Sequence, residues 1–286
     1  MSAEEAVAVP AADPRAEPGR RRAPVPALAW LGGALVVFWI GVALLSPWIA
    51  PHDLGAVVDQ DVFGPMSRAM PLGSDVLGRD VLSRIIHGTR LTIGIALVAT
   101  LIAIAVGGAL GMIAAAVGGA FDAGVSRFLD GLISIPSLLF GLVAVAALGA
   151  SVPVLIGTAA LIYMPGAYRI WRSLALNVSA TDFVTVARAR GESTGYIVRA
   201  EILPNIVGPV LTDFGLRFVF VILLLSSLSF LGLGIQPPYA DWGSLVKENI
   251  TGLSYGAPAA IMPAVALATL TVGVNLLVDN LPGRGR

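Results

Sequence analysis

The chain has 286 residues, of which 56% are hydrophobic and 13% are charged, and its 18 basic residues balance its 18 acidic ones. Soluble domains average about 25% charged residues, so this composition predicts a multi-pass membrane protein, and the zero net charge offers no field that would attract nucleic acid. The chain has no cysteine and two histidines, His52 and His87. This excludes disulfides, thiolate chemistry and a histidine metal cluster, and we expect both histidines to be exposed loop residues.

The first 25 residues are rich in Ala, Pro, Glu and Arg, which predicts a disordered cytoplasmic tail over 1–25. The apolar run that follows predicts a first transmembrane helix over 26–50. This run is too long for a cleaved signal peptide, and its end lacks the small-x-small cleavage pattern. We therefore expect it to remain as the first span.

Residues 51–90 are expected to form an external loop with an amphipathic helix. Apolar residues recur at helical spacing from Val76 to Ile86, and Asp80 and Arg84 are four apart, so they can pair on a helix. We expect an interfacial helix that packs on the outer mouth. Contact with a protein that delivers substrate is the alternative.

Residues 91–281 are expected to form a core of five helices, followed by a tail at 282–286. Charge-free stretches predict spans at 92–117, 212–234 and 258–279, and the longer gap at 131–168 is expected to hold two short spans separated at Gly149–Pro153. With the first helix this gives six transmembrane helices. A single kinked helix in that gap would instead give five and place the C-terminus outside.

Small residues are frequent in the expected spans, for example in the stretch from Val106 to Met112. They allow close helix packing, within this chain or against a second subunit. The basic residues orient the spans, because 13 of them lie on one side and 5 on the other when the N-terminus is inside. We therefore expect cytoplasmic N- and C-termini and a cytoplasmic segment at 181–204.

The spans carry no ionisable side chain near their middle, which argues against ion coupling. Asp213 and Arg217 are read as an i,i+4 pair near the cytoplasmic interface, and Tyr239 and Trp242 as interfacial anchors. Lys247 is the only lysine, and it does not lie in the Gly-Lys-Ser/Thr sequence of a nucleotide-binding phosphate loop. No catalytic set of side chains is visible.

The polar segment at 181–204 predicts a helix-turn-helix. The first helix should start at Asp182, with Ser179 or Thr181 as its cap, and should place an apolar face on one side. Gly191 should end this helix or allow close approach of another backbone. Ser193 or Thr194 should cap a second short helix that Pro204 closes. The shared face consists of Phe183, Val186, Ala187 and Arg190.

Three motifs carry a resemblance to a known family. Ala187-Arg188-Ala189 before Gly191, with Ile202-Leu-Pro-Asn205, resembles the cytoplasmic coupling loop of binding-protein-dependent ABC importer permeases. The stretches 71–90 and 229–243 resemble the C-type permease subunits of dipeptide, oligopeptide and nickel importers. The chain departs from the pattern at Thr185 and Val186, where a glutamate and an alanine often stand.

The resemblance implies the all-α type I ABC importer permease fold and a non-catalytic subunit in a prokaryotic inner membrane. The implied partners are a homologous permease, two ATP-binding subunits that hold ATP and magnesium, an extracytoplasmic solute-binding protein and membrane lipid; this chain itself would bind no cofactor and no nucleic acid. The implied cargo is a di- or oligopeptide or a related small solute. The implied ATPase-coupling residues are Asp182, Phe183, Val186, Ala187, Arg188, Arg190, Gly191 and Pro204.

Two other functions stay open from the residues alone. An ion-gradient-driven secondary transporter would require charged groups in mid-membrane, and a non-transporting membrane scaffold would leave the spacing of the 181–204 segment unexplained.

Overall fold

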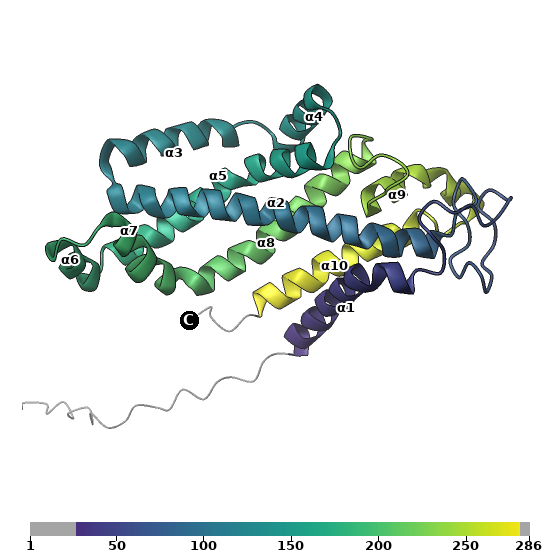
Figure 1. Ribbon diagram of the computed structural model, residues 1–286, viewed down its shortest axis with the longest axis horizontal. Helices are drawn as coiled ribbons and strands as arrows, with labels where there is room; N and C mark the ends of the chain where they lie inside the picture. Colours follow the sequence, from purple (N-terminus) through teal and green to yellow (C-terminus); the bar gives the residue numbers. More distant parts are fainter. Residues whose placement is uncertain (1–26, 281–286) are drawn as a thin grey trace, which may run out of the picture.

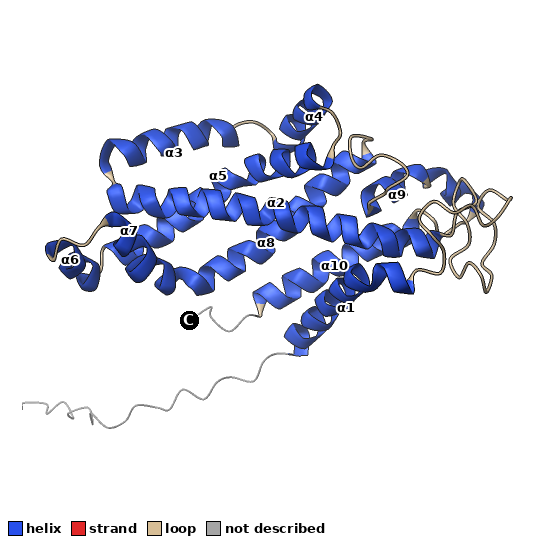
Figure 2. Ribbon diagram, viewed as in Figure 1, coloured by secondary structure: helices blue, strands red, loops and turns tan. Residues whose placement is uncertain are grey.

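The computed structural model describes residues 27–280, so the tails expected at 1–25 and 282–286 lie outside the described residues. Within this range the chain consists of helices and loops with two isolated β-bridges, in agreement with the expected all-α class. The long helices lie side by side in an elongated bundle (Figures 1 and 2). They are α1 (Ala27–Ile49), α2 (Val81–Val117), α3 (Gly119–Ile133), α5 (Val152–Ser179), α8 (Leu203–Phe230) and α10 (Ile261–Asp279), whereas the shorter α4 (Ser137–Leu148) stands at 84° to α3.

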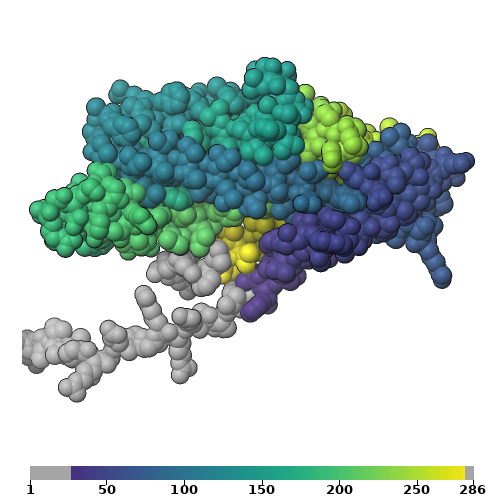
Figure 3. Space-filling model, viewed as in Figure 1, coloured from purple at the N-terminus to yellow at the C-terminus, as the bar shows by residue number. Residues whose placement is uncertain are grey.

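The short elements gather at the two ends of the bundle. One end carries α6 (Asp182–Ala189), α7 (Thr194–Tyr196) and the π-helical turn η1 (Ile197–Ile202). The other end carries the 51–80 loop, α9 (Trp242–Glu248) and the 3₁₀ turn η2 (Ile250–Tyr255), as Figures 1 and 3 show. We call these the α6 end and the α9 end.

All six expected apolar segments contain a helix. By length and hydropathy, α1, α2, the continuous helix Thr194–Phe230 and α10 are long enough to cross a membrane. The bent pair α3 and α4 makes a fifth candidate, with an 84° angle between them. The break expected at Gly149–Pro153 is confirmed, since α4 ends at Leu148 and α5, which is 28 residues long, begins at Val152.

Helix α3 covers residues for which the sequence predicted mostly no element, between the spans expected at 92–117 and 131–168. Its two acidic residues are paired with α5: Arg172 donates to both carboxylate oxygens of Asp122, and Arg169 Nη2 lies 2.6 Å from Asp130 Oδ1. Leu129, which is buried, adds an apolar contact. Charge therefore does not mark a loop here, because the partners lie on a neighbouring helix.

The glycine-rich stretch of α2 packs against α5 of the same chain. A Cβ atom at Gly111 would lie 2.6 Å from the Tyr168 carbonyl oxygen, and one at Gly108 would lie 2.5 Å from the Trp171 ring. Only glycine allows the two helix backbones to approach this closely. The close packing thus serves the chain itself.

The separate amphipathic helix expected at 71–90 is wrong. Gly73 and Gly78 have φ values of +73° and +71°, and Asp75 Oδ1 accepts hydrogen bonds from the backbone of Leu77 and Arg79, so residues 71–80 form turns. Asp80 then caps α2, and its carboxylate accepts from Ser83 N at 3.1 Å. Residues 81–90 are simply the first turns of the long α2 helix.

The contacts at the α9 end also correct three residues. Trp242 is fully buried rather than interfacial; its Nε1 donates to the Ile85 carbonyl at 3.1 Å. His52 Nδ1 lies 3.1 Å from Asp80 Oδ2, and His87, which is part of α2, contacts the His52 carbonyl. The histidines join the end of α1 to the start of α2, so they are not free loop residues. Tyr239 is exposed, as an interfacial anchor requires.

Asp213 and Arg217 do form the expected i,i+4 pair, with Arg217 Nη2 2.7 Å from Asp213 Oδ1. The pair lies midway along α8 and is buried within the bundle. Arg217 Nη1 also donates to the Tyr163 carbonyl at 2.8 Å, next to Pro165 within α5. The pair therefore ties α8 to α5.

Candidate functional site

The 181–204 segment covers the α6 end of the bundle (Figure 1). Helix α6 begins at Asp182, as expected, and this acidic residue suits the positive end of the helix dipole. Thr181 occupies the cap position, but its Oγ1 donates to the Val178 carbonyl at 2.6 Å. The expected side-chain cap is therefore absent, and Ser179 does not supply one.

One face of α6 fixes the helix to the bundle. Val184 and Ala187 are 0% and 1% exposed. Val184 belongs to a buried cluster with Trp171 of α5 and Ile202 of η1. Ala187 was expected to contact a partner, and this expectation is wrong, because the residue is covered by its own chain.

The opposite face of α6 is open. Phe183 and Val186 are 44% and 55% exposed, although both are large and apolar. They project from a helix that is held in place by Val184 and Ala187 on its other side. An apolar face on an anchored helix is a surface suited to a protein groove.

Gly191 ends α6 in a left-handed conformation with φ +80°. The Gly191 N–H donates to the Arg188 carbonyl at 2.9 Å, and the Glu192 N–H donates to the Ala187 carbonyl at 3.2 Å. This pair of bonds is a Schellman motif, which favours glycine. A Cβ atom at Gly191 would meet nothing within 4 Å, so the structure supports the helix-ending role over close approach of another backbone of this chain.

The second helix of the segment starts as expected, since Ser193 Oγ accepts from the Tyr196 N–H at 3.2 Å. Pro204 does not close it, which corrects the sequence interpretation. The helix runs on without a break from Thr194 to Phe230. A π turn precedes Pro204, with the Leu203 N–H bonded to the Val198 carbonyl, and proline is tolerated at the start of the following α-helical part.

The two arginines of the expected site are both exposed. Arg188 Nη2 donates to the Ala116 carbonyl at the end of α2, at 3.3 Å. Arg190 Nη2 lies 3.6 Å from Glu192 Oε1, in a pair open to solvent. An exposed pair of this kind contributes little to stability. Because both arginine side chains are exposed, their guanidinium groups are accessible to a partner.

The sequence interpretation missed an ionic network at the α9 end. Arg84 Nη1 lies 2.8 Å from Asp75 Oδ2 and 2.6 Å from Glu248 Oε2, and Arg79 contacts the same two carboxylates. The network joins the 51–80 loop and the start of α2 to α9. The position of Glu248, 164 residues after Arg84, gives no sequence signal for this contact.

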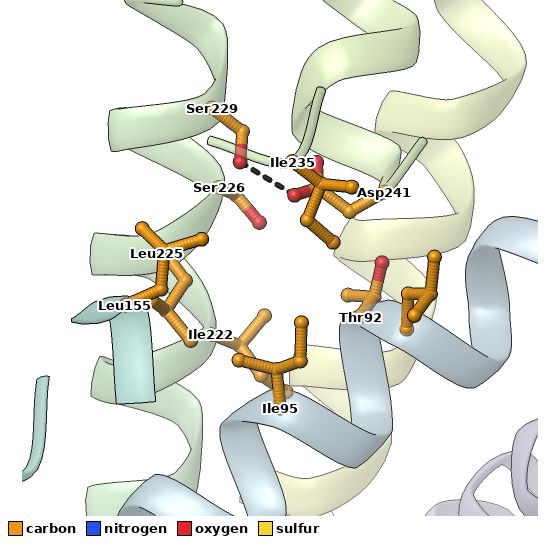
Figure 4. A pocket seen from close by; sticks show the side chains of 10 residues that line it. Thr92, Ile95, Leu155, Ile222, Leu225, Ser226, Ser229, Ile235 and Asp241 are labelled. Atoms are coloured by element: carbon orange, nitrogen blue, oxygen red, sulfur yellow. Dashed lines mark hydrogen bonds between the residues drawn. The ribbon is translucent and has the colours of Figure 1, made fainter. Parts of the chain in front are cut away.

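The buried Asp241 lines a small cavity between α2, α5 and α8 (Figure 4). Ser229 Oγ donates to Asp241 Oδ2 at 2.5 Å, and the Ser244 N–H donates to Oδ1 at 2.8 Å. Burial raises the pKa of Asp241 above its ordinary value, and these hydrogen bonds oppose the shift. Asp241 caps α9 and thus shapes the α9 end of the bundle.

Comparison with known proteins identifies the family to which this chain is similar. The family described as "binding-protein-dependent transport system inner membrane component" matches residues 107–285. A putative peptide transport system permease of Brucella suis is 33% identical over 254 residues, which cover 88% of this chain and 84% of that protein.

Two further relatives have similar coverage. A glutathione transport system permease of Pectobacterium atrosepticum is 31% identical over 89% of this chain and 85% of its own length. A di/tripeptide transport system permease of Pseudomonas aeruginosa is 32% identical over 88% and 85%. This chain therefore belongs to the binding-protein-dependent transport system inner membrane components, the multi-pass permease subunits of ABC importers.

Proposed function

We propose that the 181–204 segment is the surface through which an ATP-binding subunit drives this permease. The observation that most directly supports this proposal is that α6 has one buried face and one exposed face. Val184 and Ala187 fix the helix to the bundle, whereas Phe183 and Val186 remain open. A partner groove that closes around the open face would move the anchored face with it, and α5 and α8 would follow.

The assembly that this role requires consists of a homologous permease, two ATP-binding subunits below and a solute-binding protein above. The α6 end then faces the cytoplasm, with both chain termini, and the α9 end faces outward. The hydrolysis of ATP, with its magnesium ion, takes place in the partner subunits, and this chain is non-catalytic. The arginine distribution supports the orientation.

Peptides and peptide-like solutes such as glutathione are the proposed cargo class. The support is that relatives named as peptide, glutathione and di/tripeptide transport permeases match nearly nine tenths of this chain. We assign selection among solutes to the solute-binding protein.

The test is a pair of matched aspartate substitutions on α6, Val186→Asp and Thr185→Asp, in the assembled complex. Both positions are exposed and adjacent, so the two variants add the same charge at nearly the same place. Val186→Asp should reduce ATP-dependent uptake about tenfold or more, because a buried unpaired carboxylate disrupts an apolar contact. Thr185→Asp should transport as the unmodified protein does.

The readouts are uptake into proteoliposomes and co-purification of the ATP-binding subunit. Loss of both in Val186→Asp alone supports the assignment. Equal behaviour of the two variants would refute it. Uptake that persists without ATP and collapses with an ionophore would favour a gradient-driven carrier, and a complete complex without uptake would favour a scaffold.

A further inference from the structure

An apolar groove lies between α1, α2, α8 and α10, with a cavity volume of about 520 Å³. Each of the four helices contributes side chains to its walls, and some of these, such as Leu44 and Leu211, are strongly exposed. In a membrane protein such a groove opens to hydrocarbon unless another protein covers it. It extends along α10 from Leu270 to Val278, eight residues or about 12 Å of helix.

One charged residue, Arg90, lines the groove among residues of the described chain; the others are apolar or glycine. Arg90 is exposed, and within residues 27–280 it has no hydrogen bond or ion pair to its guanidinium group. The other residues that line the groove carry no charged or polar side chain. An arginine beside hydrocarbon is costly unless an anion accompanies it.

Contacts just beyond the C-terminal end of α1 fix the position of Arg90. His52, three residues beyond the end of α1, bonds to Ser83 and His87 of α2. Arg90 follows His87 by three residues, which is about 4.5 Å along the helix axis. It therefore lies at the groove end nearest to α9.

The rest of the groove runs away from Arg90 toward the α6 end. Gly94 follows Arg90 by one helical turn of α2, in the direction of the α6 end, and also lines the groove. A Cβ atom at Gly94 would meet nothing within 4 Å. Gly94 therefore keeps the groove open without being required for packing. This contrasts with Gly215 on the opposite wall, where a Cβ atom would clash with Val278.

We propose that this groove binds an anionic phospholipid from the leaflet at the α9 end. Its phosphate accepts hydrogen bonds from the Arg90 guanidinium, whose planar donors suit phosphate oxygens. One acyl chain lies along the groove past Gly94. A net negative headgroup is favoured because the site carries one unpaired positive charge.

The proposal depends on membrane insertion but not on the role of the 181–204 segment. The groove and α6 lie on different parts of the bundle, and no residue is shared between them. The two proposals therefore fail separately. Co-purification of the ATP-binding subunit, measured in the same samples, reports on the coupling surface alone.

The experiment is native mass spectrometry of the assembled, detergent-washed complex titrated with phosphatidylglycerol or phosphatidylcholine of the same acyl composition. Arg90→Gln removes the charge, and Gly94→Leu fills the groove. The matched controls are Arg68→Gln, an exposed arginine of the 51–80 loop, and Gly157→Leu, a glycine of α5 that also faces open space.

The unmodified complex should bind phosphatidylglycerol more tightly than phosphatidylcholine by about tenfold, the range of one charge-assisted contact. Arg90→Gln should lose this preference, and Gly94→Leu should lose retention of both lipids, while the two controls behave as the unmodified complex does. An unchanged preference in Arg90→Gln would overturn the proposal, even if Gly94→Leu failed to fold. Lipid bound by the isolated chain but excluded from the assembled complex would also overturn it, since the partner permease would then cover the groove.

Discussion

The buried pair of Asp213 and Arg217 makes a prediction whose size follows from its surroundings. Their side chains are only 6% and 7% exposed. Arg217→Met keeps the apolar bulk of the side chain but leaves the Asp213 carboxylate without its cation. Removal of one member of a buried pair costs about 3–5 kcal/mol. We therefore expect Arg217→Met to lower the free energy of unfolding by that amount.

The matched control is Arg169→Met on the same bundle. Arg169 pairs with Asp130, but those side chains are 52% and 53% exposed. Exposed pairs contribute about 0–1 kcal/mol, so this variant should be nearly neutral. The two substitutions have the same chemistry and differ in burial.

The double variant Asp213→Leu/Arg217→Met tests the reason for the loss. It removes the orphaned charge and should recover most of the stability. The Tyr163 carbonyl still loses its bond from Arg217, which leaves a residual cost of about 1–3 kcal/mol.

The assay is equilibrium unfolding in mixed micelles, followed by the fluorescence of the five tryptophans. A cost for Arg217→Met no larger than that for Arg169→Met would refute the reasoning. A double variant no more stable than Arg217→Met would refute it as well.

Three further outcomes can be measured in the same preparations. Gly111→Leu should destabilise the chain by more than about 1–3 kcal/mol, measured by the same unfolding titration, because the side chain would meet the α5 backbone at Tyr168. Gly191→Ala should lower the free energy of unfolding by about 1–2 kcal/mol and reduce ATP-stimulated uptake, since φ is +80° there and a Cβ is strained at the end of α6; unchanged uptake would contradict its positioning role. The pKa of Asp241 in the folded state is above its ordinary value of 3.8, so the stability that it contributes is present at acid pH and is lost as the pH rises through the folded-state pKa. Asp241→Asn should therefore flatten the pH dependence of the thermal unfolding temperature. An equally steep pH profile in this variant would contradict the argument.

The sequence predicted the apolar helices well, because backbone groups in a membrane must be satisfied within a helix and hydropathy therefore marks the spans. The break between α4 and α5 was readable for a local reason. Gly149 adopts φ +89° and Pro153 suits the first turn of α5.

Some features escaped prediction because they depend on contact between residues far apart in the sequence. No helix was predicted around Asp122, because its partner, Arg172, lies 50 positions later. Trp242 was interpreted as an interfacial anchor because nothing local shows that Ile85 and Thr92 accept its N–H groups. The spacing of apolar residues along the sequence does not reveal such pairs.

Two errors were avoidable from local signals. Gly73 and Gly78 within eight residues argue against a helix before Asp80, which is a good cap. Val184 and Ala187 are three apart and form an apolar stripe of their own on α6, so Ala187 could have been assigned to the inner face. The exposed pair on α6 was correctly identified as apolar.

The central claim is that the open face of α6 contacts an ATP-binding subunit. The chain has no cysteine, so single cysteines can be introduced without background. Val186→Cys on α6 and Tyr239→Cys at the α9 end, both 55% exposed, are tested in the complete complex with a short cross-linker that joins cysteine to lysine. Our account predicts that Val186→Cys cross-links to the ATP-binding subunit and that Tyr239→Cys does not. Absence of that product from Val186→Cys in an active complex, or its equal formation from Tyr239→Cys, would contradict the account.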